Sequence, residues 1–308
     1  MNPHRSSLTN VPQNEITYDM CIKALKLSIW AIFEVPNQFR TKDLWHLVLE
    51  KNYNKKHSSI TRYLFENLPH NIITSEICEY FVSDNPTLFE YVPKYLITEK
   101  MIHTVLDKNT NLIQYVPENM ITKKLCEKYL AKNGHILRFV PLQLRTIDIC
   151  EIAVKENGCA LNFVPDENKT EKMCELAVLQ HGTALQFVPE SKLTMKMCEI
   201  GARKHGLNLY WIPEKFRTLE ICNIGLETYP SAIGYVPINI VTLEMCKSCV
   251  SKNGIALMYV PEIYKTKEVC DIAVKQNSLA IKYVPESSKK RAKNDDEEIV
   301  NSKKQKTN

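Results

Sequence analysis

The chain has 308 residues, of which 44% are hydrophobic and 24% are charged, a composition that excludes a largely disordered protein. The formal net charge is +5, but residues 287–308 hold seven basic and four acidic side chains, which leaves only +2 for the rest of the chain. So small an excess does not indicate a general phosphate-binding field, and it leaves a local basic patch open. The polar opening of residues 1–10 and the absence of an apolar run of about eighteen residues predict a protein that is neither exported nor inserted in a membrane.

Proline marks a period that runs through almost the whole sequence. Every interval between successive members of the series is 24 residues, except one of 33 residues between Pro36 and Pro69. The series is Pro12, Pro36, Pro69, Pro93, Pro117, Pro141, Pro165, Pro189, Pro213, Pro237, Pro261 and Pro285. A fixed period of this size predicts a repeat array over residues 11–286, after an N-terminal tail at 1–10 and before a charged tail at 287–308 that we expect to be disordered.

Each repeat begins with a predicted helix. A threonine stands five residues after every proline up to Pro261, from Thr17 to Thr266, and threonine is a good N-cap. Apolar residues then recur at helical spacing until a glycine, such as Gly134 or Gly158, which we expect to adopt a left-handed conformation and to end the helix after about eleven residues.

A second, shorter helix is predicted after that glycine. It carries an apolar pair such as Ala160-Leu161 and an aromatic residue such as Phe163, and the next proline ends it. Because helices this short are marginal alone, the aromatic, leucine, alanine and cysteine positions should form apolar seams between stacked hairpins. The predicted fold is all-α, an α-solenoid of about eleven stacked helical-hairpin repeats.

Two repeats depart from the pattern. The repeat at 36–69 holds nine extra residues, which we place in a loop at Asn52–Ser59, and Trp45 stands there in place of the usual cysteine. In another repeat, Tyr229-Pro230 replaces the usual Asn-Gly and should change the turn.

Nine cysteines form a ladder, each nine residues after its proline. Equivalent positions of stacked helices lie roughly 8–10 Å apart, which exceeds the ~7 Å limit between the Cα atoms of a disulfide. We therefore interpret them as small buried hydrophobes, and Cys249 of the Cys246-x-x-Cys249 sequence as a core substitution. No Cys/His spacing resembles a zinc site, and no unique polar cluster resembles a catalytic one, so we expect no enzyme activity, no metal and no cofactor.

An acidic row follows the cysteines and is the candidate partner surface. Its members are Glu79, Glu127, Glu151, Glu175, Glu199 and Asp271. One interpretation is a solvated face with pairs at four-residue spacing, such as Glu151–Lys155, Glu199–Arg203 and Asp271–Lys275. The alternative is a stripe that binds a basic partner.

The C-terminal tail contains a candidate nuclear-import signal formed by Lys289, Lys290, Arg291 and Lys293. Such runs are also common in tails that only keep a protein soluble.

The sequence from Thr146 through Cys150 and Asn157-Gly158 to Phe163-Val164-Pro165 resembles a repeat family of unknown function. That family is abundant in giant DNA viruses of the mimivirus kind and occurs sporadically in bacteria and protists. The resemblance implies a viral origin and a place in the cytoplasm or nucleus of an infected host cell, or in the virion, and it implies no catalytic residues.

These observations favour a non-enzymatic scaffold that binds a host or virion protein. One alternative is a nucleic-acid-associated protein of the nucleus or virus factory that uses its basic tail. A second is an enzyme whose site lies in the irregular repeat between Trp45 and Pro69.

Overall fold

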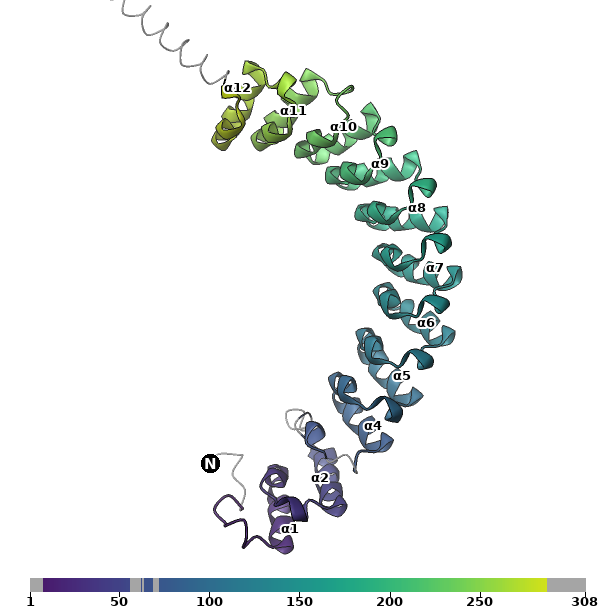
Figure 1. Ribbon diagram of the computed structural model, residues 1–308, viewed down its shortest axis with the longest axis vertical. Coiled ribbons are helices and arrows are strands. Elements are labelled where there is room, and N and C mark those ends of the chain that lie inside the picture. Colours follow the sequence, from purple (N-terminus) through teal and green to yellow (C-terminus); the bar gives the residue numbers. More distant parts are fainter. Residues whose placement is uncertain (1–7, 56–61, 63, 69–71, 287–308) are drawn as a thin grey trace, which may run out of the picture. The chain divides into compact units, whose positions relative to one another are not determined.

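The computed structural model describes residues 8–55, 62, 64–68 and 72–286, without the side chains of 51–55. The chain divides into two compact units, Met1–Ile121 and Thr122–Asn308, which are described separately. All regular elements of the described residues are helices, and no strand occurs among them. The predicted all-α fold of repeated helical hairpins is confirmed (Figure 1).

The N-terminal unit contains four described α-helices, each followed by short 3₁₀ helices except where the chain is not described. They are α1 (Tyr18–Leu27), η1 (Ile29–Phe33), η2 (Asn37–Phe39), α2 (Lys42–Lys55), α4 (Ser75–Asp84), η3 (Pro86–Tyr91), η4 (Lys94–Leu96), α5 (Glu99–Lys108), η5 (Thr110–Tyr115) and η6 (Glu118–Met120).

The C-terminal unit stacks α6 to α12 in chain order (Figure 1). Its elements are α6 (Lys123–Leu130), η7 (Gly134–Phe139), η8 (Leu142–Leu144), α7 (Ile147–Glu156), η9 (Gly158–Phe163), η10 (Asp166–Asn168), α8 (Glu171–Gln180), η11 (Gly182–Phe187), η12 (Glu190–Lys192), α9 (Met195–Lys204), η13 (Gly206–Trp211), η14 (Glu214–Phe216), α10 (Leu219–Thr228), η15 (Pro230–Tyr235), α11 (Leu243–Lys252), η16 (Gly254–Tyr259), η17 (Glu262–Tyr264), α12 (Lys267–Gln276) and η18 (Ser278–Tyr283).

Threonine begins the α-helices as predicted. In α8, for example, the Thr170 hydroxyl accepts a hydrogen bond from the Met173 N–H at 3.1 Å, which satisfies one of the free donors of the first turn. The same cap occurs at Thr17, Thr74, Thr98, Thr122, Thr194, Thr218, Thr242 and Thr266. Thr146 is an exception, because its hydroxyl donates to Asp148 instead.

The predicted left-handed glycine at the helix end was wrong. None of the eight glycines has a φ in the left-handed range. The helices end instead at the residue before the glycine, which is extended: Asn157 has φ −141° and ψ 109°, and its side chain accepts the Cys159 N–H at 3.0 Å. The asparagine therefore caps the next helix rather than only ending the previous one.

Glycine is needed for a different reason, which is the close approach of neighbouring repeats. A Cβ atom on Gly158 would lie 2.7 Å from the carbonyl oxygen of Ala177 in the next repeat. The Gly158 N–H donates to the Gln180 side chain of that repeat at 2.6 Å. Equivalent bonds join Gly134 to Glu156, Gly206 to Thr228 and Gly254 to Gln276.

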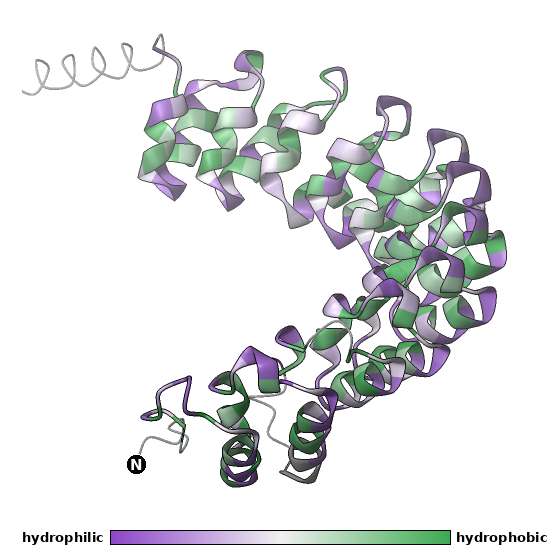
Figure 2. Ribbon diagram, turned by 60° about the horizontal axis from the view of Figure 1, so that its bottom comes forward, coloured by the Kyte–Doolittle hydropathy of each residue, from purple (hydrophilic) through white to green (hydrophobic). Residues whose placement is uncertain are grey.

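Outside the irregular repeat, where residues 62 and 64–66 are α-helical, the second element of each hairpin is a 3₁₀ helix and not the predicted second α-helix. Its three-residue period places Gly158, Leu161 and Val164 on one buried face. Asn162 points to solvent, and Phe163 is only half-buried. The aromatic row was expected in the apolar seam, whereas Tyr91, Trp211 and Tyr259 are more than 40% exposed and the other described members are half-buried. Figure 2 shows the hydrophobic residues gathered between the stacked helices and many hydrophilic ones on the loops.

The ladder cysteines are buried, which confirms their interpretation as core residues. All eleven thiols are free, and only Cys159 is half-exposed. Burial raises the pKa of Cys78, Cys126, Cys150, Cys198, Cys222 and Cys246 to about 11 and that of Cys249 to about 12. These thiols are protonated at neutral pH and are poor nucleophiles.

A thiol reagent should therefore distinguish the native from the unfolded chain sharply. We expect Ellman's reagent to label one thiol per native chain, Cys159, and all eleven in denaturant. The Cys159→Ser variant should remove the native label. Rapid labelling of two or more native thiols would contradict the buried ladder.

The irregular repeat differs from its prediction in one respect. Helix α2 continues to Lys55 and has 14 residues, so the first part of the expected loop Asn52–Ser59 is helical. Trp45 is buried in the position of the usual cysteine. Residues 56–61, 63 and 69–71 lie outside the described part of the chain, as do residues 1–7 of the predicted N-terminal tail at 1–10 and the whole predicted tail at 287–308.

Candidate partner-binding surface

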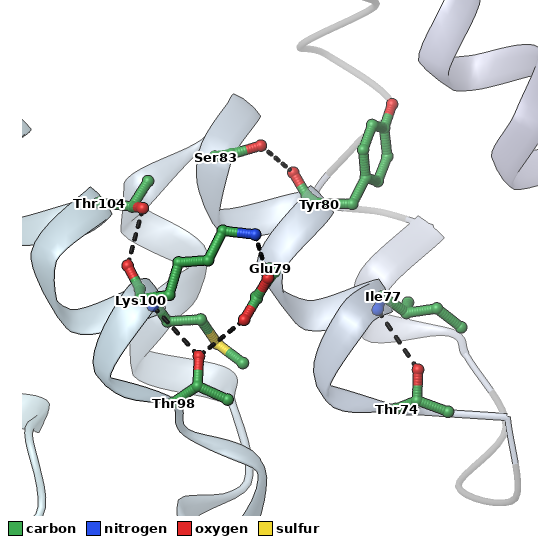
Figure 3. Close-up of polar contacts among 9 residues, drawn as sticks. Thr74, Ile77, Glu79, Tyr80, Ser83, Thr98, Lys100 and Thr104 are labelled. Atoms are coloured by element: carbon green, nitrogen blue, oxygen red, sulfur yellow. Dashed lines mark hydrogen bonds and ion pairs between the residues drawn. The ribbon is translucent and has the colours of Figure 1, made fainter.

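The acidic row contacts the next repeat along the chain. Glu79 on α4 accepts hydrogen bonds from the Thr98 hydroxyl and from the Lys100 ammonium, both at 2.8 Å (Figure 3). Thr98 is the N-cap of α5, and Lys100 lies in its first turn. The bonds from these two donors hold the pKa of Glu79 below its usual value. Glu79 thus links the start of one helix to the middle of the preceding one.

The same link recurs elsewhere in the array with partners 21 residues apart. Glu175 pairs with Lys196, and Lys247 pairs with Glu268 at 2.9 Å with the two charges exchanged. In these three pairs, therefore, either of the two neighbouring repeats can supply the acid.

The remaining acids behave differently from one another. Glu199 pairs with Arg203 on its own helix at 2.8 Å, which confirms that predicted pair. The predicted pairs of Glu151 with Lys155 and of Asp271 with Lys275 are wrong, since no ion pair joins them. Glu127, Glu151 and Asp271 are exposed. The structure thus gives Glu79 and Glu175 a stacking role, and binding of a basic partner along the row stays a prediction.

Asp148 provides a pH-dependent version of this contact. It pairs with Lys123 of the preceding repeat, and the bonds from Lys123 and then from Thr146 lower its pKa to about 2. A carboxylate with a lowered folded-state pKa stabilises the fold above its unfolded pKa of about 3.9, and this contribution is lost as the pH falls through about 2.

The Asp148→Asn variant should consequently lose less stability than the wild type between pH 4 and pH 2. Urea midpoints measured at both pH values test this, with Asp271→Asn as the exposed control. Equal acid sensitivity of wild type and Asp148→Asn would contradict the role of the Lys123 contact.

Cations that bind the ends of the 3₁₀ helices were missed in the sequence. The half-buried Arg145 donates to the carbonyl oxygens of Val140 and Phe163, both at 2.8 Å, and of Arg138 at 3.1 Å. It thereby ties together the ends of two successive 3₁₀ helices, η7 and η9, whose last carbonyls lack partners in the helix. Burial lowers the pKa of its guanidinium. The residue before the threonine is a cation in some repeats and apolar in others, as at Leu193, and that difference was the available signal.

Arg217 makes the same connection and positions an exposed aromatic patch. Its guanidinium donates to the carbonyls of Tyr235 at 2.8 Å and Tyr210 at 3.4 Å. The Tyr210 ring lies edge-on to the rings of Trp211, at 4.7 Å between centroids, and Tyr235, at 5.3 Å. Tyr210 is 53% exposed and Trp211 is 43% exposed.

The patch continues into the next repeat. Gly234 stands where Tyr210 stands one repeat earlier, and a Cβ there would lie 3.2 Å from the Cβ of Tyr259. Tyr259 and the adjacent Met258 are 44% and 40% exposed. We name the set Tyr210, Trp211, Tyr235, Met258 and Tyr259 the aromatic patch. Equivalent positions to Tyr210 in other repeats are polar, as in Asn162 and Gln186, so the patch is confined to neighbouring repeats.

A groove opens between α10 and α11, on the α-helical side of the same repeats. Its volume is about 350 Å³, and it is lined by Asn223, Leu226, Glu227, Glu244, Met245, Ser248, Cys249 and Lys252. It occurs where Pro230 replaces the glycine that elsewhere bonds to the next repeat. The predicted change at Tyr229-Pro230 thus coincides with a local opening of the stack.

Other candidate chemistry is limited in the described residues. Over these ranges, no group of three or more His, Cys, Asp or Glu side chains is arranged to hold a metal ion. No described helix has the length and apolarity needed to cross a membrane. The import-signal candidates Lys289, Lys290, Arg291 and Lys293 lie outside the described part of the chain.

Comparison with known proteins supports the repeat character. Residues 122–169 and 242–289 each match a family model described as a domain of unknown function (DUF4116). Each match spans 48 residues, which is twice the 24-residue interval between successive prolines of the series. No curated protein and no solved structure matched the chain.

Proposed function

We propose that this chain is a non-enzymatic repeat scaffold and that it binds a protein partner through the aromatic patch. The observation that carries the proposal is the cluster in which the Tyr210 ring contacts the rings of Trp211 and Tyr235, while Tyr210 and Trp211 are exposed to solvent. Contiguous exposed apolar surface is uncommon on proteins without partners. Tyrosine and tryptophan dominate the binding energy of protein interfaces.

The scaffold part of the proposal has separate support. The buried thiols, such as Cys150, Cys198 and Cys249, are held protonated by burial and are poor nucleophiles. Two segments of the chain match a family model that has no assigned activity. The viral origin, a host or virion partner, and a location in the cytoplasm or nucleus of an infected cell rest on the sequence resemblance and belong to the proposal alone.

Repeat symmetry offers a matched test that preserves the fold. In the Tyr210→Gln/Trp211→Phe variant, both residues are exchanged for those at the same positions of the preceding repeat, Gln186 and Phe187. Tagged chains recovered from the cells that make the protein should retain a stoichiometric protein partner, and the variant should retain at least about tenfold less of it. The control is Asn162→Gln, the same kind of exchange at an equivalent position outside the patch.

Two results would oppose the proposal. If the wild type and the double variant retain equal amounts of the partner, the aromatic patch is not part of the interface. Recovery of nucleic acid alone, with binding that falls steeply with salt and depends on residues 287–308, would favour the nucleic-acid alternative.

A further inference from the structure

The last repeat exposes residues that every preceding repeat of the C-terminal unit buries. Ile281 is 49% exposed, whereas its counterparts are at most 2% exposed. Those counterparts are Leu137, Leu161, Leu185, Leu209, Ile233 and Leu257. Val274 is half-buried, although Val154, Val178 and Val250 are fully buried at the same position. We name Val274 and Ile281 the terminal face, because the next hairpin would cover these two positions.

The array covers its other end with its own chain. Before α1, Leu8 and Ile16 are 3% and 5% exposed. The hydroxyl of Thr9 donates to Glu34 at 3.1 Å, which ties this segment to the first hairpin. A repeat array needs such capping because its end repeats would otherwise leave apolar surface in water.

The terminal face is bordered by positive charge. Lys275 follows Val274, Lys282 follows Ile281, and both side chains are exposed. The apolar residues thus lie beside two lysines, which favours an occupant that is apolar and acidic.

The chain that leaves this face contains one segment with that composition. Residues 295–300 read Asp-Asp-Glu-Glu-Ile-Val, the only place in 287–308 where two apolar residues adjoin an acidic run. Asp295 is nine residues beyond Glu286, and nine residues can span up to about 30 Å. The segment cannot simply continue the array, because Lys290 stands where the capping threonine would be and Glu297-Glu298 where the buried Ala-Val pair would be.

We propose that residues 295–300 fold back and cap the terminal face. In this proposal Ile299 and Val300 cover Val274 and Ile281, while the four carboxylates lie near Lys275 and Lys282. This capping does not depend on the proposed function, since the aromatic patch lies on earlier repeats.

Hydrogen exchange in the full chain tests the proposal. Amides of η18 (Ser278–Tyr283) should exchange about tenfold faster in Ile299→Asp/Val300→Asp than in the wild type, because the cap would no longer bury apolar surface. The control Lys303→Ala/Lys304→Ala, outside the segment, should exchange like the wild type. Equal rates in all three chains would overturn the proposal.

Disulfide trapping locates the cap directly. In a Cys159→Ser background the other native thiols are buried, so Ile281→Cys and Ile299→Cys introduce the only reactive pair. Mild oxidation by oxidised glutathione should convert the pair to an intramolecular disulfide with the loss of two hydrogens and a monomeric mass. The control pair Leu142→Cys and Ile299→Cys should stay unlinked, although Leu142 is 69% exposed. Disulfide-linked dimers, or protection that grows with protein concentration, would mean that a second copy covers the face and would overturn the proposal.

Discussion

Replacement of Gly206 by alanine is expected to lower the free energy of unfolding by about 3 kcal/mol, the upper end of the usual cost of overpacking a core. The new Cβ would lie 2.7 Å from the carbonyl carbon of Gly225, closer still to its oxygen, and 2.9 Å from the Cβ of Tyr229. Two of these atoms belong to the backbone of the next repeat, so relief requires the repeats to separate. Separation would also strain the bond from the Gly206 N–H to the Thr228 hydroxyl at 2.8 Å.

The measurement is urea unfolding monitored by circular dichroism, and Gly234→Ala is the control variant. Gly234 is exposed, and its added Cβ would meet only the Tyr259 side chain, at 3.2 Å. Its midpoint should therefore remain close to that of the wild type. Equal midpoints for Gly206→Ala and Gly234→Ala would mean that close backbone approach is not what the glycine permits.

The second large effect is expected for Arg145→Leu, which should cost about 2 kcal/mol. The variant carries the type of side chain that Leu193 places at the same position two repeats later, so the leucine itself can be accommodated. The cost arises because three carbonyl oxygens lose a charged donor in a partly buried place.

Arg138→Leu is the matched control for that variant. The Arg138 side chain is exposed and lies over the Phe139 ring, with 4.4 Å from its guanidinium carbon to the ring centroid. Its removal should change stability by no more than about 0.5 kcal/mol. A comparable loss in both variants, measured by urea unfolding, would argue that Arg145 acts through general charge and not through the three bonds.

The start of each helix could be predicted from the sequence because the signal is local. A threonine that caps its own helix needs no information from other repeats, and nine of the helices carry the bond. The role of the turn glycine was harder to predict, because a glycine can permit either a left-handed backbone conformation or the close approach of another repeat. Only the distance from Gly158 to Ala177 in the next repeat decides between these reasons.

The second element was mistaken for an α-helix because its apolar residues fit two periods. Leu161 and Val164, three residues apart, suit an α-helical face and a 3₁₀ face equally well over so short a segment. The half-exposed position of Phe163 follows only from the three-residue period. The aromatic row consequently appeared to be core.

The candidate site was only partly visible for a related reason. The acidic row is apparent in the sequence, but its partners lie 21 residues away, and the register between repeats sets that distance. The aromatic patch did leave a signal. Tyr210 is an aromatic residue at a position held by Asn162 and Gln186 in other repeats, directly before the only tryptophan of the aromatic row.

The missing glycine at Pro230 has a thermodynamic consequence for the whole C-terminal unit. In most pairs of neighbouring repeats, the N–H of the turn glycine donates to a side chain of the next repeat. Pro230 has no N–H to donate. Between its repeat and the next, the Asn253 side-chain amide donates instead to the Ser231 hydroxyl at 3.1 Å. In a linear array, stability is a sum of the repeats and of their nearest-neighbour couplings. The weakest coupling therefore lies between α10 and α11, and the last two hairpins, α11 to η18, can melt as a cooperative block while α6 to α10 remain folded.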